Sequence, residues 1–117
     1  MNIEQFRNHC LKKKGVTEEF PFGNETLVYK VMGKLFALTG VDNFESINLK
    51  CDPEEGVLLR EKYDAVQPGY HMNKKHWNTV MLDGSLTDKL VFKLIDDSYN
   101  LVAAGLTKAN KKALEEL

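Results

Sequence analysis

The stretch of sequence that decides the fold reads Thr26-Leu27-Val28-Tyr29-Lys30-Val31-Met32-Gly33-Lys34-Leu35-Phe36-Ala37-Leu38-Thr39. Its two halves, 26–32 and 34–39, are rich in β-branched and aromatic residues, and Gly33 separates them. Side chains of these kinds favour strands, and a glycine readily adopts the positive φ of a tight hairpin turn. This pattern predicts a β-hairpin, and therefore the start of an antiparallel sheet.

Three further segments extend the predicted sheet. In 46–51 apolar and polar residues alternate strictly, so one face of this strand should be buried and the other exposed to solvent. Residues 66–72 contain a proline and a glycine, which allow only a short, interrupted strand, whereas 76–82 is a longer strand that ends in a turn. A short edge strand through Phe20 is a further candidate.

Helix signals surround these strands. Each predicted helix begins at a residue whose side chain can accept a hydrogen bond from the first turn. In the second helix we expect Val57, Leu58 and Leu59 to face the core. The predicted helices are about ten residues after Asn2, the segment from Asp52-Pro53 to about Tyr63, the longest helix from Thr87 to Gly105, and 108–117 after Thr107.

The predicted order is helix, three strands, helix, two strands and two helices. Consecutive strands joined by short turns indicate an antiparallel sheet, and segregated helices indicate the α+β class. We therefore expect a two-layer sandwich of about five strands with the helices packed on one face. The 117 residues form a single domain, 1–117, and the absence of strand–helix–strand alternation argues against a doubly wound nucleotide-binding sheet.

The composition, with 43% hydrophobic and 28% charged residues, is that of a globular protein. Sixteen Lys and Arg against seventeen Asp and Glu leave a formal charge of −1, which removes the overall positive field of an avid nucleic-acid binder but permits a local basic patch. The sequence has no signal-peptide pattern and no apolar run long enough to span a bilayer. We expect a cytoplasmic protein that does not bind membranes. Cys10 and Cys51 are expected to be buried thiols.

The motif search argues against several kinds of chemistry. The sequence contains no phosphate-cradling glycine loop, no H-E-x-x-H and no G-x-S-x-G. His9 lies beside Cys10 on the first helix, where adjacent residues cannot point at one metal, and His71 and His76 have no cysteine or carboxylate at ligand spacing nearby. Neither a metal nor another cofactor is therefore expected. His76 could act as a general base, but no nucleophile accompanies it, and an enzyme is the least favoured interpretation.

Residues 70–79 are unusual in gathering two lysines, two histidines, two asparagines, a tyrosine and the only tryptophan. Cations attract phosphates, aromatic rings stack on bases, and an asparagine amide can read an adenine edge. The simpler interpretation places Trp77 in the core and leaves the lysines in a solvated loop. The candidate nucleic-acid contacts are His71, Asn73, Lys74, Lys75, His76 and Trp77.

This region also resembles a known family. The segment Val66-Gln67-Pro68-Gly69-Tyr70-His71-Met72-Asn73-Lys74-Lys75-His76-Trp77-Asn78-Thr79-Val80, followed by Leu82-Asp83-Gly84-Ser85-Leu86, is similar to the signature of the MmcQ/YjbR family of small bacterial proteins. In that family a proline-containing segment leads into an Asn-Lys-x-His-Trp-x-Thr-Val strand and an Asp-Gly-Ser turn. The Phe22-Gly23 segment, the hairpin 27–38 and the helix through Asp96-Asp97-Ser98-Tyr99 also resemble the family.

The resemblance implies a compact fold related to the frataxin-like and secretion-chaperone-like two-layer sandwiches. It also implies DNA binding, which is commonly ascribed to the family through a double-wing arrangement, and it brings no settled substrate, cofactor or catalytic residue. Asn73, Lys74, His76 and Trp77 occupy the matching positions of the motif, and Lys75 occupies the variable one.

Two hypotheses of function follow. The leading one is a non-enzymatic binding module that contacts the phosphates of DNA through Lys74 and Lys75, with help from His71 and His76. The alternative is a protein-interaction or chaperone-like adaptor that uses an exposed face of the sheet. Its motivation is that Val28 and Phe36 lie opposite the residues assigned to the core, so an apolar patch is expected there.

Overall fold

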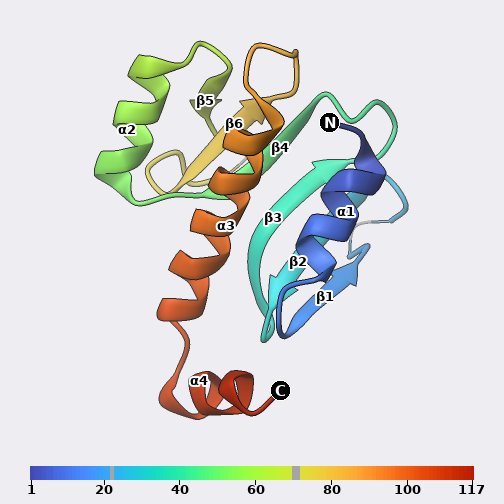
Figure 1. Cartoon of the computed structure of the whole chain (residues 1–117), viewed down its shortest axis with the longest axis vertical. Coiled ribbons are helices and arrows are strands. Elements are labelled where there is room, and N and C mark those ends of the chain that lie inside the picture. Colours follow the sequence, from blue (N-terminus) through green and yellow to red (C-terminus); the bar gives the residue numbers. More distant parts are fainter. Residues whose placement is uncertain (22, 70–71) are drawn as a thin grey trace.

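The structure is a computed structural model that describes residues 1–21, 23–69 and 72–117. It has the α+β architecture expected from the sequence (Figure 1). The elements follow one another as α1 (Ile3–Leu11), β1 (Val16–Glu19), β2 (Thr26–Val31), β3 (Lys34–Gly40), β4 (Ser46–Lys50), α2 (Pro53–Lys62), β5 (Val66–Pro68), β6 (Trp77–Met81), α3 (Asp88–Ala104) and α4 (Lys108–Glu115).

Within the described ranges, six strands form one antiparallel sheet with the order β1-β2-β3-β4-β6-β5, where about five strands were expected. The additional strand, β1, pairs with the outer edge of β2. It ends at Glu19, and the Phe20 side chain is 48% exposed, so the edge strand predicted through Phe20 lies slightly earlier in the chain. Pro21 explains the early end, because proline has no N–H to donate to a strand partner.

The hairpin that decides the fold is confirmed. Strands β2 and β3 pair in antiparallel register, and the turn between them consists of Met32 and Gly33. Both residues have positive φ, 48° and 83°, as a two-residue turn needs in order to match the twist of its strands. The alternation predicted for 46–51 is also present, since Ile47 and Leu49 are buried in β4.

The helix starts are confirmed at their capping residues. Asn2 and Gln5 form a reciprocal capping box at α1, and Asp52 accepts hydrogen bonds from the first turn of α2. Thr87 and Thr107 cap α3 and α4 in the same way. These caps act within four residues of chain, which is why they could be read from the sequence.

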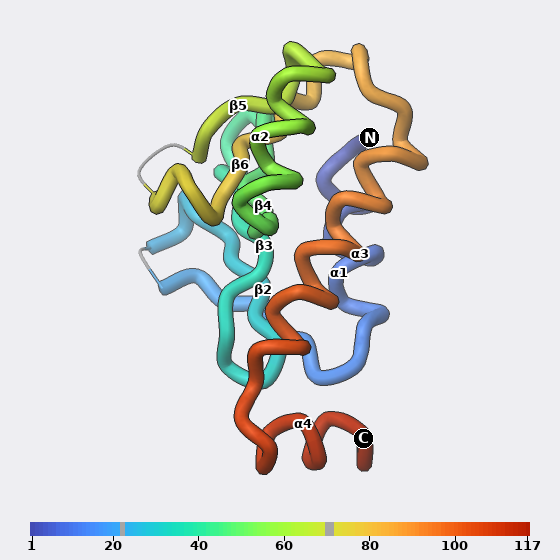
Figure 2. The backbone as a smooth tube through the Cα atoms, turned by 90° about the vertical axis from the view of Figure 1, so that its left-hand side faces the viewer, coloured from blue at the N-terminus to red at the C-terminus, as the bar shows by residue number. Residues whose placement is uncertain are grey.

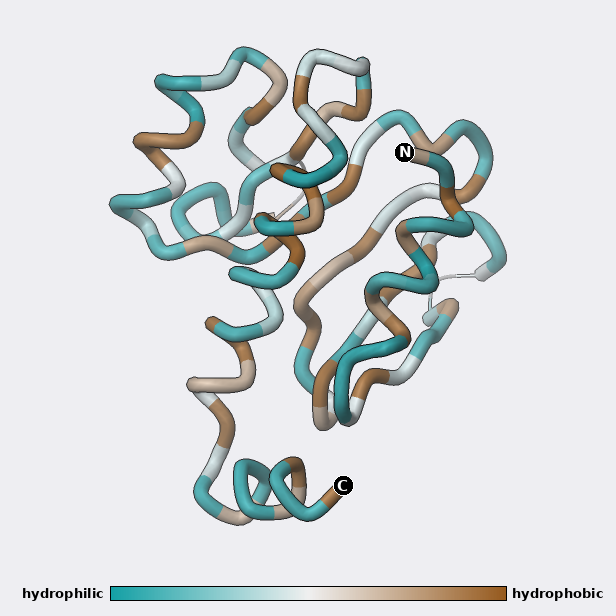
Figure 3. Tube along the Cα trace, viewed as in Figure 1, coloured by the Kyte–Doolittle hydropathy of each residue, from teal (hydrophilic) through white to brown (hydrophobic). Residues whose placement is uncertain are grey.

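Helices α1 and α3 cover one side of the sheet (Figures 1 and 2). Helix α2 lies beside β5, which forms the edge of the sheet opposite to β1. Figure 3 shows hydrophobic residues along the strands that face α1 and α3, whereas α4 is largely hydrophilic. No helix in the described part of the chain combines the length and apolarity of a membrane span. The core cluster consists of Phe6, Cys10, Leu27, Tyr29, Val31, Phe36, Ala37, Ile47, Leu49, Val80, Val91, Leu94, Ile95 and Val102.

Helix α2 turns a different face to the sheet than expected. Val57 and Leu58, predicted to be buried, are 43% and 63% exposed, whereas Gly56 is buried. A Cβ atom at Gly56 would lie 2.7 Å from the Sγ atom of Cys51. The close approach of a glycine to the end of β4, rather than a stripe of apolar side chains, therefore sets the rotation of this helix.

The exposed apolar sheet face expected at Val28 and Phe36 is not present, so this prediction was wrong. The register of β2 and β3 shifts between Tyr29 and Lys30, which leaves Phe36 as the extra residue of a bulge. Phe36 is fully buried in the core, with its ring edge-on to Tyr99 at 5.4 Å. Val28 is only 2% exposed. The observation that motivated the adaptor hypothesis is thereby removed.

Candidate functional site

The predicted contact residues lie in the loop between β5 and β6 and at the first position of β6. His71 falls outside the described residues. Asn73, Lys74 and Lys75 are exposed, and His76 is half-buried. Trp77 is 9% exposed, in line with the simpler interpretation that its ring belongs to the packed interior. The loop therefore presents polar and cationic groups but not the indole.

Asn73 shapes the turn of this loop. Its side-chain oxygen accepts a hydrogen bond of 2.9 Å from the backbone N–H of Lys75. Its backbone carbonyl accepts hydrogen bonds from His76 N at 3.2 Å and Trp77 N at 3.0 Å. An asparagine that reads adenine uses both its amide oxygen and its amide nitrogen. Because the oxygen is engaged within the loop, Asn73 positions the lysines rather than reading a base.

The two lysines lie on different parts of this surface. Lys74 Nζ donates a hydrogen bond of 3.2 Å to the carbonyl of Gly69 across the loop. The Lys75 side chain lines a shallow hollow beside α2, together with Glu54, Leu58 and Arg60. Among the described residues, no carboxylate forms an ion pair with either ammonium group. Neither ammonium group is therefore held in an ion pair within this part of the structure, and each can contact an anion of its own.

Trp77 fixes the loop to the sheet. It pairs with Lys50 of β4, and its carbonyl accepts a hydrogen bond of 2.9 Å from Gly69 N. A Cβ atom at Gly69 would come within 2.9 Å of the Trp77 Cβ atom, so only a glycine allows the two backbones to approach so closely. At the other side, Cys51 N donates to the carbonyl of His76 at 2.8 Å. These contacts hold both ends of the loop against the sheet.

Sequence reasoning missed Arg60 and Asn78. Arg60 Nη1 donates to Asn78 Oδ1 at 2.6 Å, and Asn78 Nδ2 donates to the carbonyl of Gly56 at 3.4 Å. Asn78 is 2% exposed, and it lies on the same face of β6 as Val80. The available signal was an asparagine two residues before Val80 in a segment predicted to be a strand, because residues two apart share a face of the sheet.

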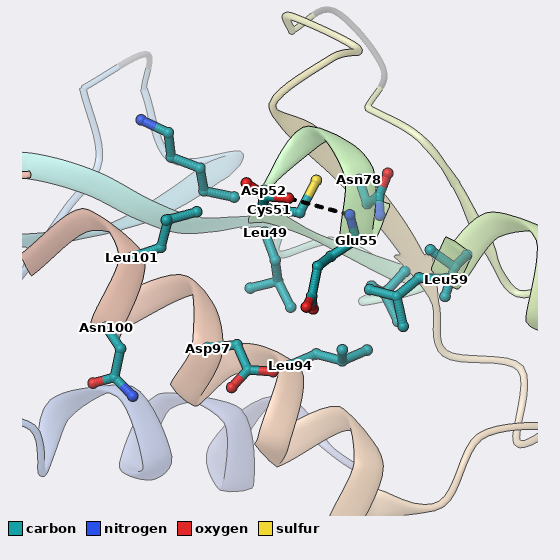
Figure 4. A pocket seen from close by; sticks show the side chains of 13 residues that line it. Leu49, Cys51, Asp52, Glu55, Leu59, Asn78, Leu94, Asp97, Asn100 and Leu101 are labelled. Atoms are coloured by element: carbon teal, nitrogen blue, oxygen red, sulfur yellow. Dashed lines mark hydrogen bonds between the residues drawn. The ribbon is translucent and has the colours of Figure 1, made fainter. Parts of the chain in front are cut away.

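A cleft lies on the other side of α2 from the hollow that holds Lys75. It has a volume of about 340 Å³ and is bounded by α2, α3 and the strands β4, β5 and β6 (Figure 4). Burial raises the pKa of the Cys51 thiol in its wall, and Arg60 opposes the rise. Cys51 is half-buried, whereas Cys10 is fully buried as expected. The apolar lining residues are Leu49, Leu59, Val66, Val80, Leu94 and Leu101.

Metal binding finds no support in the described ranges 1–21, 23–69 and 72–117. No group of three or more His, Cys, Asp or Glu side chains is placed there to hold an ion. His9, which the sequence placed beside Cys10 on the first helix, instead contacts Asp96 of α3 at 2.7 Å and stacks on the ring of Phe92. This histidine joins α1 to α3.

Comparison with known proteins identifies the relatives of this chain. The YjbR family model matches residues 11–101. The uncharacterized protein YbdF of Escherichia coli O157:H7 is 44% identical over 94 residues, which cover 80% of this chain and 77% of YbdF. The uncharacterized protein YjbR of Escherichia coli K12 is 36% identical over 118 aligned positions, which cover 100% of both chains.

Solved structures have the same fold. The crystal structure of the Deinococcus radiodurans protein DR2400, with a DUF419 domain, superposes with a TM-score of 0.90 at 40% identity, covering 97% of this chain and 88% of DR2400. The crystal structure of a Pseudomonas syringae protein superposes with a TM-score of 0.72 at 34% identity, covering 86% of this chain and 98% of that one. The resemblance seen in the sequence is thereby confirmed.

Proposed function

The chain belongs to the YjbR family, and we propose that it is a non-enzymatic binding module that contacts the phosphates of DNA through the β5–β6 loop. The observation that carries this proposal is the pair of exposed, adjacent lysines, Lys74 and Lys75, neither of which is ion-paired within the described part of the chain. On a protein of formal charge −1, such a surface attracts a polyanion only locally.

The hydrogen bonds around Asn73 support this proposal, because they fix the backbone that carries both lysines. A cation on an ordered turn loses less conformational entropy on binding than one on a free chain. Arg60 lies in the same hollow as Lys75, and its positive charge offsets that of Glu54, which lines the hollow too.

The buried ring of Trp77 and the engaged oxygen of Asn73 limit what the loop can read. Neither is free to stack on a base or to form the two hydrogen bonds that recognise adenine. Contacts that involve phosphates alone carry no direct sequence information. The proposal is therefore one of weak, sequence-independent binding, with a dissociation constant of about 10⁻⁴ to 10⁻⁶ M at physiological salt.

A mobility shift of a mixed-sequence duplex at low and at physiological salt tests this proposal. The wild-type chain should retard the duplex at low salt and lose most of this effect at the higher salt, because counterion release drives the contact. The Lys74→Ala, Lys75→Ala double variant should retard the duplex much less than the wild type at low salt, and its retardation should change less with salt. If wild type and double variant retard the duplex equally, or if the wild type fails to retard it at low salt, the proposal is wrong.

A further inference from the structure

We propose that the cleft between α2 and α3 binds a small organic cation, in which an ammonium group is attached to an apolar body. The cleft has a volume of about 340 Å³, within the range of small-molecule sites. It is separate from the β5–β6 loop surface, and the proposal does not depend on DNA binding.

The floor of the cleft selects an apolar body. Leu49, Val80 and Leu94 belong to the core cluster and form its inner wall. Leu101 stands at its edge and remains 38% exposed, whereas Leu94, two turns earlier on α3, is buried. A large apolar side chain that lines a cavity and stays exposed gains by being covered, because removing apolar surface from water is favourable.

The rim of the cleft selects a cation. Glu55 on α2 and Asp97 on α3 extend their carboxylates toward the space between the two helices, and Asp52 lies beside them (Figure 4). The first turn of α2 accounts for Asp52 and Glu55, because acidic groups are favourable at a helix N-terminus. It does not account for Asp97, which lies in the middle of α3. Lys50 of β4 also lines the cleft, so its lining carries three carboxylates against one ammonium group and has a net negative charge above the apolar floor.

One of these carboxylates, Asp97, already pairs with a cation, Lys93, which lies one turn earlier on the exposed side of α3. Its Nζ atom lies 2.7 Å from Asp97 Oδ2, and its side chain is 67% exposed. The hydrogen bond and charge of Asp97 raise the pKa of Lys93, and the charge of Glu55 adds to this. Both carboxylates thus act on one ammonium group. Because exposed ion pairs are weak, a ligand ammonium that also covers the apolar floor can displace Lys93 from Asp97.

Three probes of similar size test the chemistry of the site: 2-phenylethylamine, 2-phenylethanol and 3-phenylpropanoate, which are respectively cationic, neutral and anionic near neutral pH. Titrations of the whole chain, followed by amide chemical shifts, should place the amine at Leu49, Leu94 and Leu101. The amine should bind about fivefold more tightly than the alcohol, and the anion should bind least. Equal affinity for the amine and the alcohol would overturn the proposal.

Matched variants locate the charge. Glu55→Gln and Asp97→Asn should each weaken binding of 2-phenylethylamine about threefold, while Glu54→Gln, an equal charge change on the adjacent residue of α2, should leave it unchanged. Glu54 is the control because it lines the hollow on the other side of the helix. Equal effects of Glu54→Gln and Glu55→Gln would show that net charge, not the cleft, attracts the amine, and would overturn the proposal.

Lys93→Met provides a test with the opposite sign. It removes the internal ammonium group that competes for Asp97, so it should tighten binding of 2-phenylethylamine about twofold to threefold. Damage to the fold can only weaken binding, so a gain cannot be mistaken for a structural effect. Binding that Lys93→Met weakens or leaves unchanged would contradict the role assigned to the carboxylates.

Discussion

The guanidinium of Arg60 on α2 donates a hydrogen bond of 2.6 Å to the side-chain oxygen of Asn78 in β6. Asn78 is 2% exposed, and its amide nitrogen donates to the carbonyl of Gly56. One buried side chain therefore joins α2 to the strand that carries the β5–β6 loop. The cleft and the loop surface lie on opposite sides of this connection.

Replacing Asn78 should loosen α2 from the sheet. In Asn78→Ala the Arg60 guanidinium and the Gly56 carbonyl lose their partner, and a small cavity forms. We expect the free energy of unfolding to fall by about 2 kcal/mol, as measured by urea denaturation. Asn110→Ala, at a half-buried position of α4, is the control and should change it by about 0.5 kcal/mol or less. Equal losses in both variants would contradict this assignment.

Ser98 should be a larger contributor to stability than its size suggests. It is fully buried, and its Oγ atom donates to the carbonyl of Phe36 at 2.6 Å while accepting from Lys50 N at 2.9 Å. In Ser98→Ala both backbone groups lose this partner, which should cost about 2 kcal/mol in free energy of unfolding. Ser85→Ala, at an exposed turn, is the matched control. A Ser98→Ala variant as stable as Ser85→Ala would refute this role.

The Glu18 carboxylate should make stability depend on acid pH. Arg7 donates hydrogen bonds of 2.8 and 3.0 Å to it and holds its pKa below the usual range; burial opposes this shift, and the Tyr29 hydroxyl at 2.6 Å adds to it. Because the folded-state pKa is lowered, the stabilisation is complete above the unfolded pKa of about 4.3 and is lost as the pH falls through the folded value.

Urea denaturation of Glu18→Gln measures this contribution. The variant should be less stable than the wild type by about 1 kcal/mol at pH 7, and the difference should shrink at pH 3, which lies below the unfolded-state pKa of about 4.3. Glu25→Gln, which changes an exposed carboxylate in the same part of the chain, should show no such pattern. A difference of equal size at both pH values would contradict the assignment.

Gly56 should not tolerate alanine, although alanine normally stabilises a helix interior by about 1 kcal/mol relative to glycine. The added Cβ atom would lie 2.7 Å from Cys51 Sγ and 3.3 Å from Arg60 Nη1. We therefore expect Gly56→Ala to lower the melting temperature, and Cys51→Ala in the same chain to recover part of the loss. If Gly56→Ala raises the melting temperature, the close packing of α2 on β4 is wrong.

The features that the sequence predicted well are those that a few neighbouring residues determine. The turn at Met32 and Gly33 and the caps at Asn2 and Asp52 depend on local hydrogen bonds and backbone conformation. The sheet has six strands where about five were expected, because the candidate edge strand near Phe20 is formed as β1, which is stabilised by pairing with the edge of β2. Strand pairing of this kind is tertiary and overrides weak local preference.

The features that the sequence did not predict arise from how the elements pack and pair with one another. The rotation of α2 follows from Gly56 against Cys51, and the burial of Phe36 follows from a bulge opposite β2. Neither leaves a periodic signal. In the candidate site, exposure of Lys74 and Lys75 agrees with the sequence interpretation, whereas Asn73 has a structural role that only the hydrogen bonds of the loop reveal.

The salt dependence of duplex binding tests the central claim most directly. Across a salt series, Lys74→Ala with Lys75→Ala should reduce the slope of log affinity against log salt by about 1.8, because each lysine releases the counterions of about one phosphate. The control pair Lys108→Ala with Lys111→Ala removes the same charge from α4, at the far end of the molecule (Figure 1), and should leave the slope unchanged. Equal slopes for the loop variant and the wild type would contradict the account.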